Sequence, residues 1–403
     1  MTDTNNPLEQ NQPYDLMLVG GRVFDPAGAL DIVADVAIRG DKIVSIKPGL
    51  ERRGAGRIID ARGKLVVPGL VDLHTHVYWG GTGLGVDAET VCCRSGTTTF
   101  VDAGSAGAGN FPGFRRFIAE PSRVNVLAFL NVSYAGIFGF GCNLWVGECQ
   151  DLRLLDRDEC LNAVEQNRDL IVGIKVRLGA EAGGESGLKP LEIAREVADR
   201  LSLPIMTHVD MPPPKTTDAL ALMRPGDIWT HCFRGPPNSI IADSGEVEPE
   251  IIAAKRRGIR FDVGHGFGSF SFSVARRMIA DRIYPDSISS DVHAFNFNGP
   301  ARDVLHVASK FLSLGMPLSA VIEKISSAPA SSISRSDLGR LVEGGRADVA
   351  VLSHVAAPCE FVDSHGEVLL GEQQLTLDAV VANGRLLRDV IDVDHSNTPN
   401  ILR

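Results

Sequence analysis

Six residues that can bind a metal or transfer a proton fall in or at the ends of short apolar runs: His74, His76, Lys175, His208, His231 and Asp291. Neutral imidazole and carboxylate are common zinc ligands. His74 and His76 stand two residues apart at the end of GLVDLHTH, so a strand would point both rings to one side. Taken alone, this pair is consistent with a metal site or with ordinary surface histidines.

Lys175 lies inside the apolar run IVGIKVRLG. Burying its charge is costly, so the pKa falls and a neutral amine remains. A neutral amine reacts with CO₂ to form a carbamate, whose two oxygens can bridge two metals. A buried ion pair is the alternative interpretation of this lysine.

His208 and His231 each close a short apolar run, PIMTHVD and IWTHC. One such histidine is usually part of the packing, but two on successive runs favour a shared site with the first pair and the lysine. Asp291, in SISSDVHA, is suited to bind a metal and to accept a proton. An aspartate that caps a helix is the alternative.

These residues belong to eight apolar runs that alternate with amphipathic stretches such as LEIAREVADRL and VEPEIIAAKRRG. Strands that alternate with helices indicate a parallel sheet, and eight such units indicate a closed (β/α)₈ TIM barrel, an α/β fold. The active site of such a barrel lies at the carboxyl ends of its strands. The eight predicted strands are residues 69–76, 97–104, 124–133, 171–179, 204–210, 228–232, 259–266 and 287–294.

Both ends of the chain are rich in short strands of a different kind, cut by Gly, Asp and Pro. RADVAVLS, GEVLLG and LDAVVANGRLLRD near the carboxyl end show the same pattern of short strands and turns as residues 14–67. We therefore expect a small β-sandwich domain formed from both termini. The predicted boundaries are 1–67 for its first half, 68–335 for the barrel, and 336–403 for its second half and tail.

Composition narrows the range of partners. The 403 residues carry a net charge of −10 without a basic stripe, which disfavours nucleic acid and anionic membrane. No apolar run is long enough to span a membrane, and the amino terminus lacks the features of a signal peptide. Seven irregularly spaced cysteines fit a reducing cytoplasm. We expect a cytoplasmic homo-oligomer that acts on a small molecule.

The order of the six residues along the strands resembles the amidohydrolase superfamily in its binuclear form with a carboxylated lysine. PGLVDLHTH is similar to the first-strand signature of that family, and GGRADVAVL to its return into the small domain. The resemblance implies two Zn²⁺ per chain, the first held by His74 and His76 and the second by His208 and His231. A carbamate on Lys175, derived from CO₂, would bridge the two metals. Asp291 would bind the first zinc and move the proton during hydrolysis.

Within the superfamily, the chain most resembles the deacetylase branch related to dihydroorotases. TTTFVDAGSAGAGNF, GIKVRLG and the long stretch that begins SSDVHAFNFNGPARDV carry this likeness. It implies the removal of an acetyl or other acyl group from a small carboxylate-bearing substrate, an N-acetyl amino acid or an O-acetyl 2-hydroxy acid.

Four further residues are candidates for substrate binding. Arg177 is two residues after Lys175 on the same face, where it would clamp a carboxylate or form a structural ion pair. Tyr134 would donate a hydrogen bond or simply pack, and Ser105 opens a glycine-rich loop. Arg234 is a second candidate for binding a carboxylate. His265 and His293 are expected near the site.

Three alternatives stay open at this point. The same metal set would serve a cyclic amide hydrolase that resembles dihydroorotase or dihydropyrimidinase. A single-metal enzyme would result if Lys175 were not carboxylated. A non-catalytic barrel scaffold is the alternative from another class, against which the complete set of six residues argues.

Overall fold

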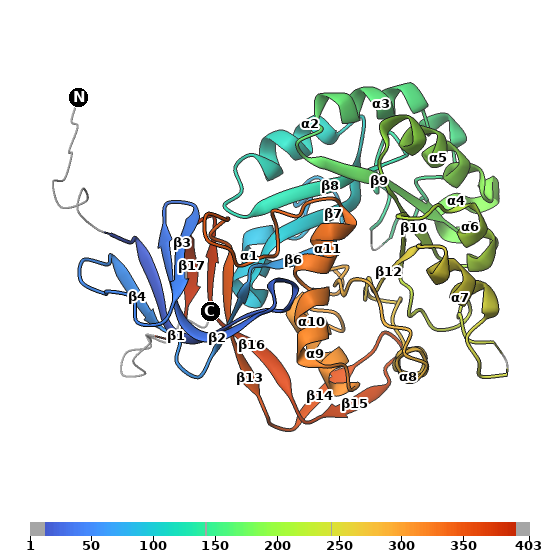
Figure 1. Cartoon of the computed structure of the whole chain (residues 1–403). Coiled ribbons are helices and arrows are strands. Elements are labelled where there is room, and N and C mark those ends of the chain that lie inside the picture. The colour runs from blue at the N-terminus through green and yellow to red at the C-terminus, as the bar shows by residue number, and fades with distance from the viewer. Residues whose placement is uncertain (1–12, 142, 243, 392–403) are drawn as a thin grey trace, which may run out of the picture.

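The computed structural model describes residues 13–141, 143–242 and 244–391. It contains an α/β barrel and a separate sheet built from both ends of the chain, as Figure 1 shows with the blue and red strands side by side. The outermost parts of the predicted terminal segments, residues 1–12 and 392–403, lie outside the described residues.

Seven parallel strands form the barrel wall, each hydrogen-bonded to the next in chain order. They are β6 (Leu70–Thr75), β7 (Thr97–Gly107), β8 (Asn125–Asn131), β9 (Ile171–Leu178), β10 (Ile205–Val209), β11 (Ile228–Thr230) and β12 (Arg260–Asp262). Each of them falls within or closely overlaps one of the predicted runs, so the expected barrel is confirmed.

The eighth predicted run, residues 287–294, closes the wall without forming a regular strand. Parallel bridges join Ser287 to Asp262 of β12 and Val292 to Thr75 of β6. The backbone N–H of Asp291 also donates to the carbonyl of His74 at 2.7 Å. This segment therefore connects the last barrel strand to the first and brings Asp291 beside His74.

Alternation along the strands separates two layers of side chains. In β9, Ile174 and Val176 pack towards the helices, whereas Lys175 and Arg177 face the interior cavity. Below that cavity, an apolar cluster that includes Leu73, Phe129 and Met206 fills the barrel. The position of Lys175 is thus a direct consequence of the period of two residues along a strand.

Helices cover the outside of the barrel wall (Figure 1). In α5 (Lys189–Leu201), apolar residues recur every three or four positions, and that stripe is buried, as in Leu191, Ala194 and Ala198. Aspartates cap several of the helices, for example Asp303, which accepts from the backbone N–H of His306 at 2.9 Å. The helices are α1 (Ala88–Ser95), α2 (Phe111–Phe114), α3 (Arg157–Gln166), α4 (Ala180–Gly183), α5 (Lys189–Leu201), α6 (Thr216–Leu222), α7 (Pro249–Arg256), α8 (Phe272–Ala280), α9 (Val304–Ser313), α10 (Leu318–Lys324) and α11 (Ser327–Ser332). Among the described residues, no helix has the length and apolar character needed to cross a membrane.

Strands from both termini share one eight-stranded sheet with a common apolar core. They are β1 (Leu16–Asp25), β2 (Leu30–Arg39), β3 (Lys42–Lys47), β4 (Arg57–Asp60), β5 (Leu65–Pro68), β13 (Val349–Val355), β16 (Gln374–Ala382) and β17 (Arg385–Asp389). The antiparallel pairing of β5 with β13 joins the amino-terminal strands to the carboxyl-terminal ones.

One predicted strand of this sheet lies elsewhere. GEVLLG contains β15 (Val368–Gly371), which pairs with β14 (Cys359–Val362) in a separate two-stranded hairpin. Phe361 of this hairpin is buried in the core of the barrel domain beside His306 of α9. Packing against α9, which the local pattern of β15 does not reveal, therefore sets the position of the hairpin.

Candidate metal centre

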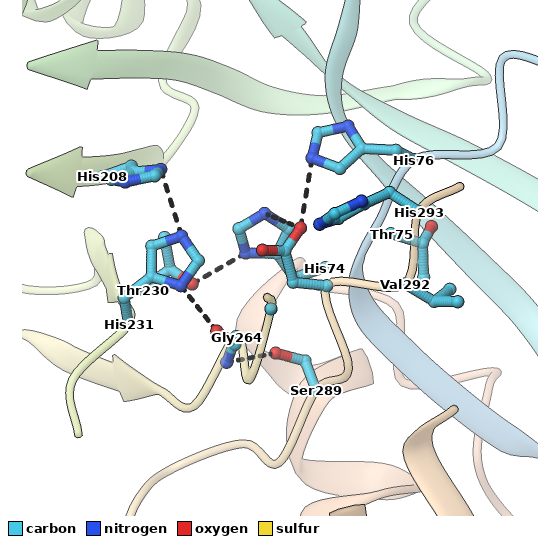
Figure 2. Close-up of polar contacts among 12 residues, drawn as sticks. His74, Thr75, His76, His208, Thr230, His231, Gly264, Ser289, Val292 and His293 are labelled. Carbon is cyan, nitrogen blue, oxygen red and sulfur yellow. Dashed lines mark hydrogen bonds and ion pairs between the residues drawn. The ribbon is translucent and has the colours of Figure 1, made fainter. Parts of the chain in front are cut away.

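The six predicted chemistry-bearing residues meet at the carboxyl ends of the barrel strands. Five of them, His74, His76, Lys175, His208 and Asp291, line a cavity of about 590 Å³. The sixth, His231, follows β11 directly, and its ring lies beside the rings of His208 and His74 (Figure 2).

Asp291 forms a compact group with the first histidine pair. Its Oδ1 lies 3.3 Å from Nε2 of His74 and 3.2 Å from Nε2 of His76. This oxygen is buried, and no donor among the described residues satisfies it. A buried orphan acceptor costs free energy, so a group of this kind fits a cation held between the carboxylate and the two rings.

All four histidines are suited to bind a metal as neutral rings. Burial is the main cause that lowers the pKa of His76 to about 4 and holds the pKa values of His74, His208 and His231 well below the ordinary value. Each imidazole therefore offers a nitrogen lone pair at pH 7.

His208 and His231 form a second group next to the first. Nδ1 of His208 lies 3.1 Å from Nε2 of His231, and the other ring nitrogen of His231 lies 2.6 Å from the carbonyl oxygen of Gly264. Because a carbonyl only accepts hydrogen bonds, Nδ1 of His231 carries the proton and Nε2 keeps its lone pair. The pair therefore offers donor atoms that suit a second metal.

Lys175 stands next to the first group. Its side chain is fully buried, and Nζ lies 3.5 Å from Nε2 of His74. Burial lowers the pKa of Lys175 to about 8, which increases the fraction of neutral amine. A Cβ at Gly104, whose φ is +84°, would lie 2.6 Å from Cγ of Lys175, so the glycine leaves room for the lysine side chain.

Two of the six residues hold an unusual backbone conformation. His231 has φ of 64° and Asp291 has φ of 50°, in the left-handed region that non-glycine residues seldom adopt. Such conformations cost on the order of 1 kcal/mol and cluster at functional sites. In both residues, this backbone turn directs the side chain towards the metal-binding groups.

Arg177 lines the cavity between two buried carboxylates. Its guanidinium nitrogens lie 3.5 Å from Oε2 of Glu148 and 3.7 Å from Oδ2 of Asp210. Neither contact is short enough for a good hydrogen bond, and Nε of Arg177 is buried with no hydrogen-bond partner in the part of the chain that the structure describes. The guanidinium is thus held in place electrostatically and retains donors for a substrate.

The other three predicted substrate contacts have different outcomes. Arg234 lines the cavity, with Nη1 3.3 Å from Nε2 of His208. Ser105 lies outside the cavity lining, and its hydroxyl contacts Nδ1 of His76 at 2.8 Å. Tyr134 also lies outside the lining: its ring lies against Gly109, and the residue is 43% exposed. Neither side chain is therefore part of the cavity lining: Ser105 lies within β7 and contacts the ring of His76, and Tyr134 lies beside Gly109.

Several cavity residues lie outside the predicted set. His293 lines the cavity, and its Nδ1 accepts from the backbone N–H of Phe295 at 3.2 Å, so Nε2 carries the proton. His293 was expected near the site because it lies two residues after Asp291 in the sequence. Aromatic side chains of three loops form much of the remaining wall: Phe140, Trp145, Phe267 and Phe295. No local pattern marks these loop residues as cavity residues. His265, expected near the site, instead contacts Nζ of Lys310 and stacks on Phe270.

Comparisons with known proteins agree with this arrangement. The amidohydrolase family pattern matches residues 57–108, which include His74 and His76. Deacetylase Atu3266 of Agrobacterium fabrum is 40% identical over 342 residues, which cover 85% of this chain and 83% of the relative.

Two solved structures are similar over nearly the whole chain. The crystal structure of a dihydroorotase is 36% identical, with a TM-score of 0.84, and the match covers 92% of this chain and 98% of that one. The crystal structure of an adenine deaminase is 28% identical, with a TM-score of 0.86, and the match covers 93% and 99%. The barrel, the cavity and these relatives together show that the chain belongs to the amidohydrolase superfamily and is a metal-dependent hydrolase.

Proposed function

We propose that the protein is a zinc-dependent deacylase that removes an acetyl or similar acyl group from a small carboxylate-bearing substrate. The substrate class is an N-acetyl amino acid or an O-acetyl 2-hydroxy acid. The proposal rests on the buried Oδ1 of Asp291, which faces two imidazole nitrogens and has no hydrogen-bond donor within residues 13–141, 143–242 and 244–391. The deacetylase name of the relative from Agrobacterium fabrum supports the reaction type.

In this proposal, His74 and His76 hold one zinc and His208 and His231 hold the other. The neutral amine of Lys175 would add CO₂ and lose a proton, and the resulting carbamate would supply anionic oxygen ligands for the metals. When bound, zinc supplies a Lewis acid for the substrate carbonyl and makes hydroxide available near neutral pH.

Asp291 moves the proton. Burial raises the pKa of Asp291 to about 6, so the carboxylate is ionised at pH 7.5 and is still a competent base. It accepts the proton released as the nucleophile adds to the carbonyl and gives it to the leaving oxygen or nitrogen. Its position against both His74 and His76 keeps it within reach of the reacting atoms.

Two further side chains orient the substrate. Arg177 binds the substrate carboxylate with the donors that Glu148 and Asp210 leave free. His293 presents a protonated Nε2 because the backbone of Phe295 occupies its Nδ1, and it donates to a substrate oxygen. Glu148 and Asp210 offset the charge of Arg177 and so allow it to remain buried.

An acyl-release assay tests the proposal. Purified protein would be incubated with N-acetyl amino acids and O-acetyl 2-hydroxy acids of both hands, and acetate release would be measured. Turnover of one chiral series is the expected result. Acetate release from no member of the panel would contradict the proposed substrate class.

Hydrolysis of a cyclic amide is the second candidate, favoured by the likeness to a dihydroorotase structure at 36% identity. Dihydroorotate and dihydrouracil in the same assay separate the two, because ring opening of either without acetate release would favour this alternative.

A further inference from the structure

A line of hydrogen-bonded side chains lies behind His74, on the side of the ring away from the cavity. Nδ1 of His74 lies 2.7 Å from the hydroxyl of Thr230, and that hydroxyl donates to Oδ2 of Asp262 at 2.8 Å. Thr230 and Asp262 face each other as partners in the pairing of β11 with β12. All three side chains are buried. Figure 2 shows the contact between Thr230 and His74.

The positions of the protons on His74 and Thr230 follow from which groups can donate and which can only accept. The hydroxyl of Thr230 has one proton, which it donates to a carboxylate that can only accept. Towards His74 the hydroxyl must therefore accept, so Nδ1 of His74 carries a proton. The lone pair of this ring is then on Nε2, the atom that lies 3.3 Å from Oδ1 of Asp291.

Asp262 is itself fixed by neighbouring hydroxyls. It accepts from Ser287 at 2.6 Å and from Ser289 at 2.7 Å, besides Thr230. Ser289 in turn accepts from the backbone N–H of Gly264, the residue whose carbonyl contacts His231 (Figure 2). A Cβ at Gly264 would lie 2.4 Å from the Thr230 hydroxyl, so only glycine leaves room for this contact.

We propose that Thr230 and Asp262 are positioning residues that fix the orientation and tautomer of His74 and thereby set the affinity of the first metal site. The inference rests on the proposed metal centre and goes beyond it, since neither residue touches the cavity. Groups of this kind that hold a ligating histidine typically change metal affinity by about 10–100-fold when they are removed.

The second histidine of the pair has a similar arrangement. Nδ1 of His76 lies 2.8 Å from the hydroxyl of Ser105, and the buried carboxylate of Asp102 accepts from the backbone N–H of Ser105 at 2.7 Å. A hydroxyl backed by a buried carboxylate therefore stands behind each ring, which also accounts for the position of Ser105 outside the cavity.

The chain offers a matched control for a test of this inference. Thr207 on β10 precedes His208 as Thr230 precedes His231, and it is equally buried. Its hydroxyl has no hydrogen-bond partner among the described residues. Thr207→Val therefore repeats the chemistry of Thr230→Val on the neighbouring strand without removing a contact to a histidine.

The experiment measures zinc affinity by competition with a chelator for the wild type, Thr230→Val, Thr230→Ser and Thr207→Val. The melting temperature of each metal-stripped protein reports the structural effect separately. Thr230→Val is expected to weaken one zinc site by about 10–100-fold, while Thr230→Ser and Thr207→Val stay close to the wild type.

Two results would overturn the inference while the proposed metal centre stands. One is a wild type with two zincs whose affinities Thr230→Val does not change. The other is an equal loss in Thr230→Ser, since that variant keeps the hydroxyl. A wild type that binds no zinc would instead remove the proposed metal centre, and the inference with it.

Discussion

Asp291 contacts His74 twice: its backbone N–H donates to the carbonyl of His74 at 2.7 Å, and its Oδ1 lies 3.3 Å from Nε2 of the same residue. The first contact is part of barrel closure and the second is part of the candidate metal centre. The hydrogen bonding that joins the ends of the barrel wall therefore also positions the carboxylate. Formation of the site is in this way coupled to formation of the fold.

Asp291→Asn tests the role of this carboxylate in proton transfer. The amide keeps an oxygen that can bind a metal but is not a base, so we expect zinc to be largely retained and kcat to fall by about 10²–10⁴-fold. Zinc content and steady-state kinetics on the same preparation check this. A kcat near that of the wild type would show that another group moves the proton.

Gly104→Ala tests the close approach of the β7 backbone to Lys175. A Cβ there would lie 2.7 Å from Cβ of Lys175, whereas Gly63, with a similar positive φ, has open space around it. We expect Gly104→Ala to lower the free energy of unfolding by about 1–3 kcal/mol more than Gly63→Ala. Urea unfolding midpoints of the two variants measure the difference. Equal midpoints would mean that the strand shifts to accommodate the methyl group.

Arg177→Lys tests recognition of the substrate carboxylate. The lysine retains the charge between Glu148 and Asp210 but loses the planar fork of donors. We expect KM to rise by about 10–100-fold for the carboxylate substrate, with a much smaller change for its methyl ester. If KM rose equally for the acid and the ester, Arg177 would have no specific role in binding the carboxylate.

Burial of Lys310 is expected to make the stability of the protein depend on pH. Its Nζ is buried and donates to Nε2 of His265 and to the carbonyls of Pro300 and Val362. Burial lowers the pKa of Lys310 to about 7 from an ordinary value of 10.5. Between pH 7 and pH 10.5, Lys310 is protonated in the unfolded chain but neutral in the folded protein. The free energy of unfolding therefore rises by roughly 1.4 kcal/mol for each pH unit in this range.

The contribution of the neutral Lys310 amine to the free energy of unfolding is therefore fully present above about pH 10.5, and it is lost as the pH falls towards about 7. Lys310→Met, which cannot titrate, is the reference. Urea unfolding at pH 7.5 and 9.5 should show the wild type gaining stability relative to this variant. A stability difference that is independent of pH would contradict the lowered pKa.

Sequence periodicity predicted the parts of the site that depend on a single strand. The period of two residues along a strand placed His74 beside His76 and Lys175 beside Arg177, and each pair lines the cavity. The barrel order then implied that His208, His231 and Asp291 would join them. The proximity of these residues follows from the strand period and the barrel order, both of which can be read from one sequence.

Features that depend on lateral contacts could not be predicted in this way. The link from Thr230 to Asp262 depends on the register of β11 against β12, and the aromatic wall depends on how separate loops fold over the cavity. The position of Tyr134 after a strand end is consistent with a substrate contact or with packing, and the structure has its ring beside Gly109, outside the cavity lining. Loop conformation is the part of a barrel that local pattern determines least.

The most direct test of the proposed binuclear centre is the zinc content per chain of the wild type and of Lys175→Met, both purified without chelator. Methionine fills the buried space of the lysine but cannot form a carbamate. Two zincs per chain are expected in the wild type and at most one in the variant. One zinc or none in the wild type, or two in Lys175→Met, would contradict the bridging role of Lys175.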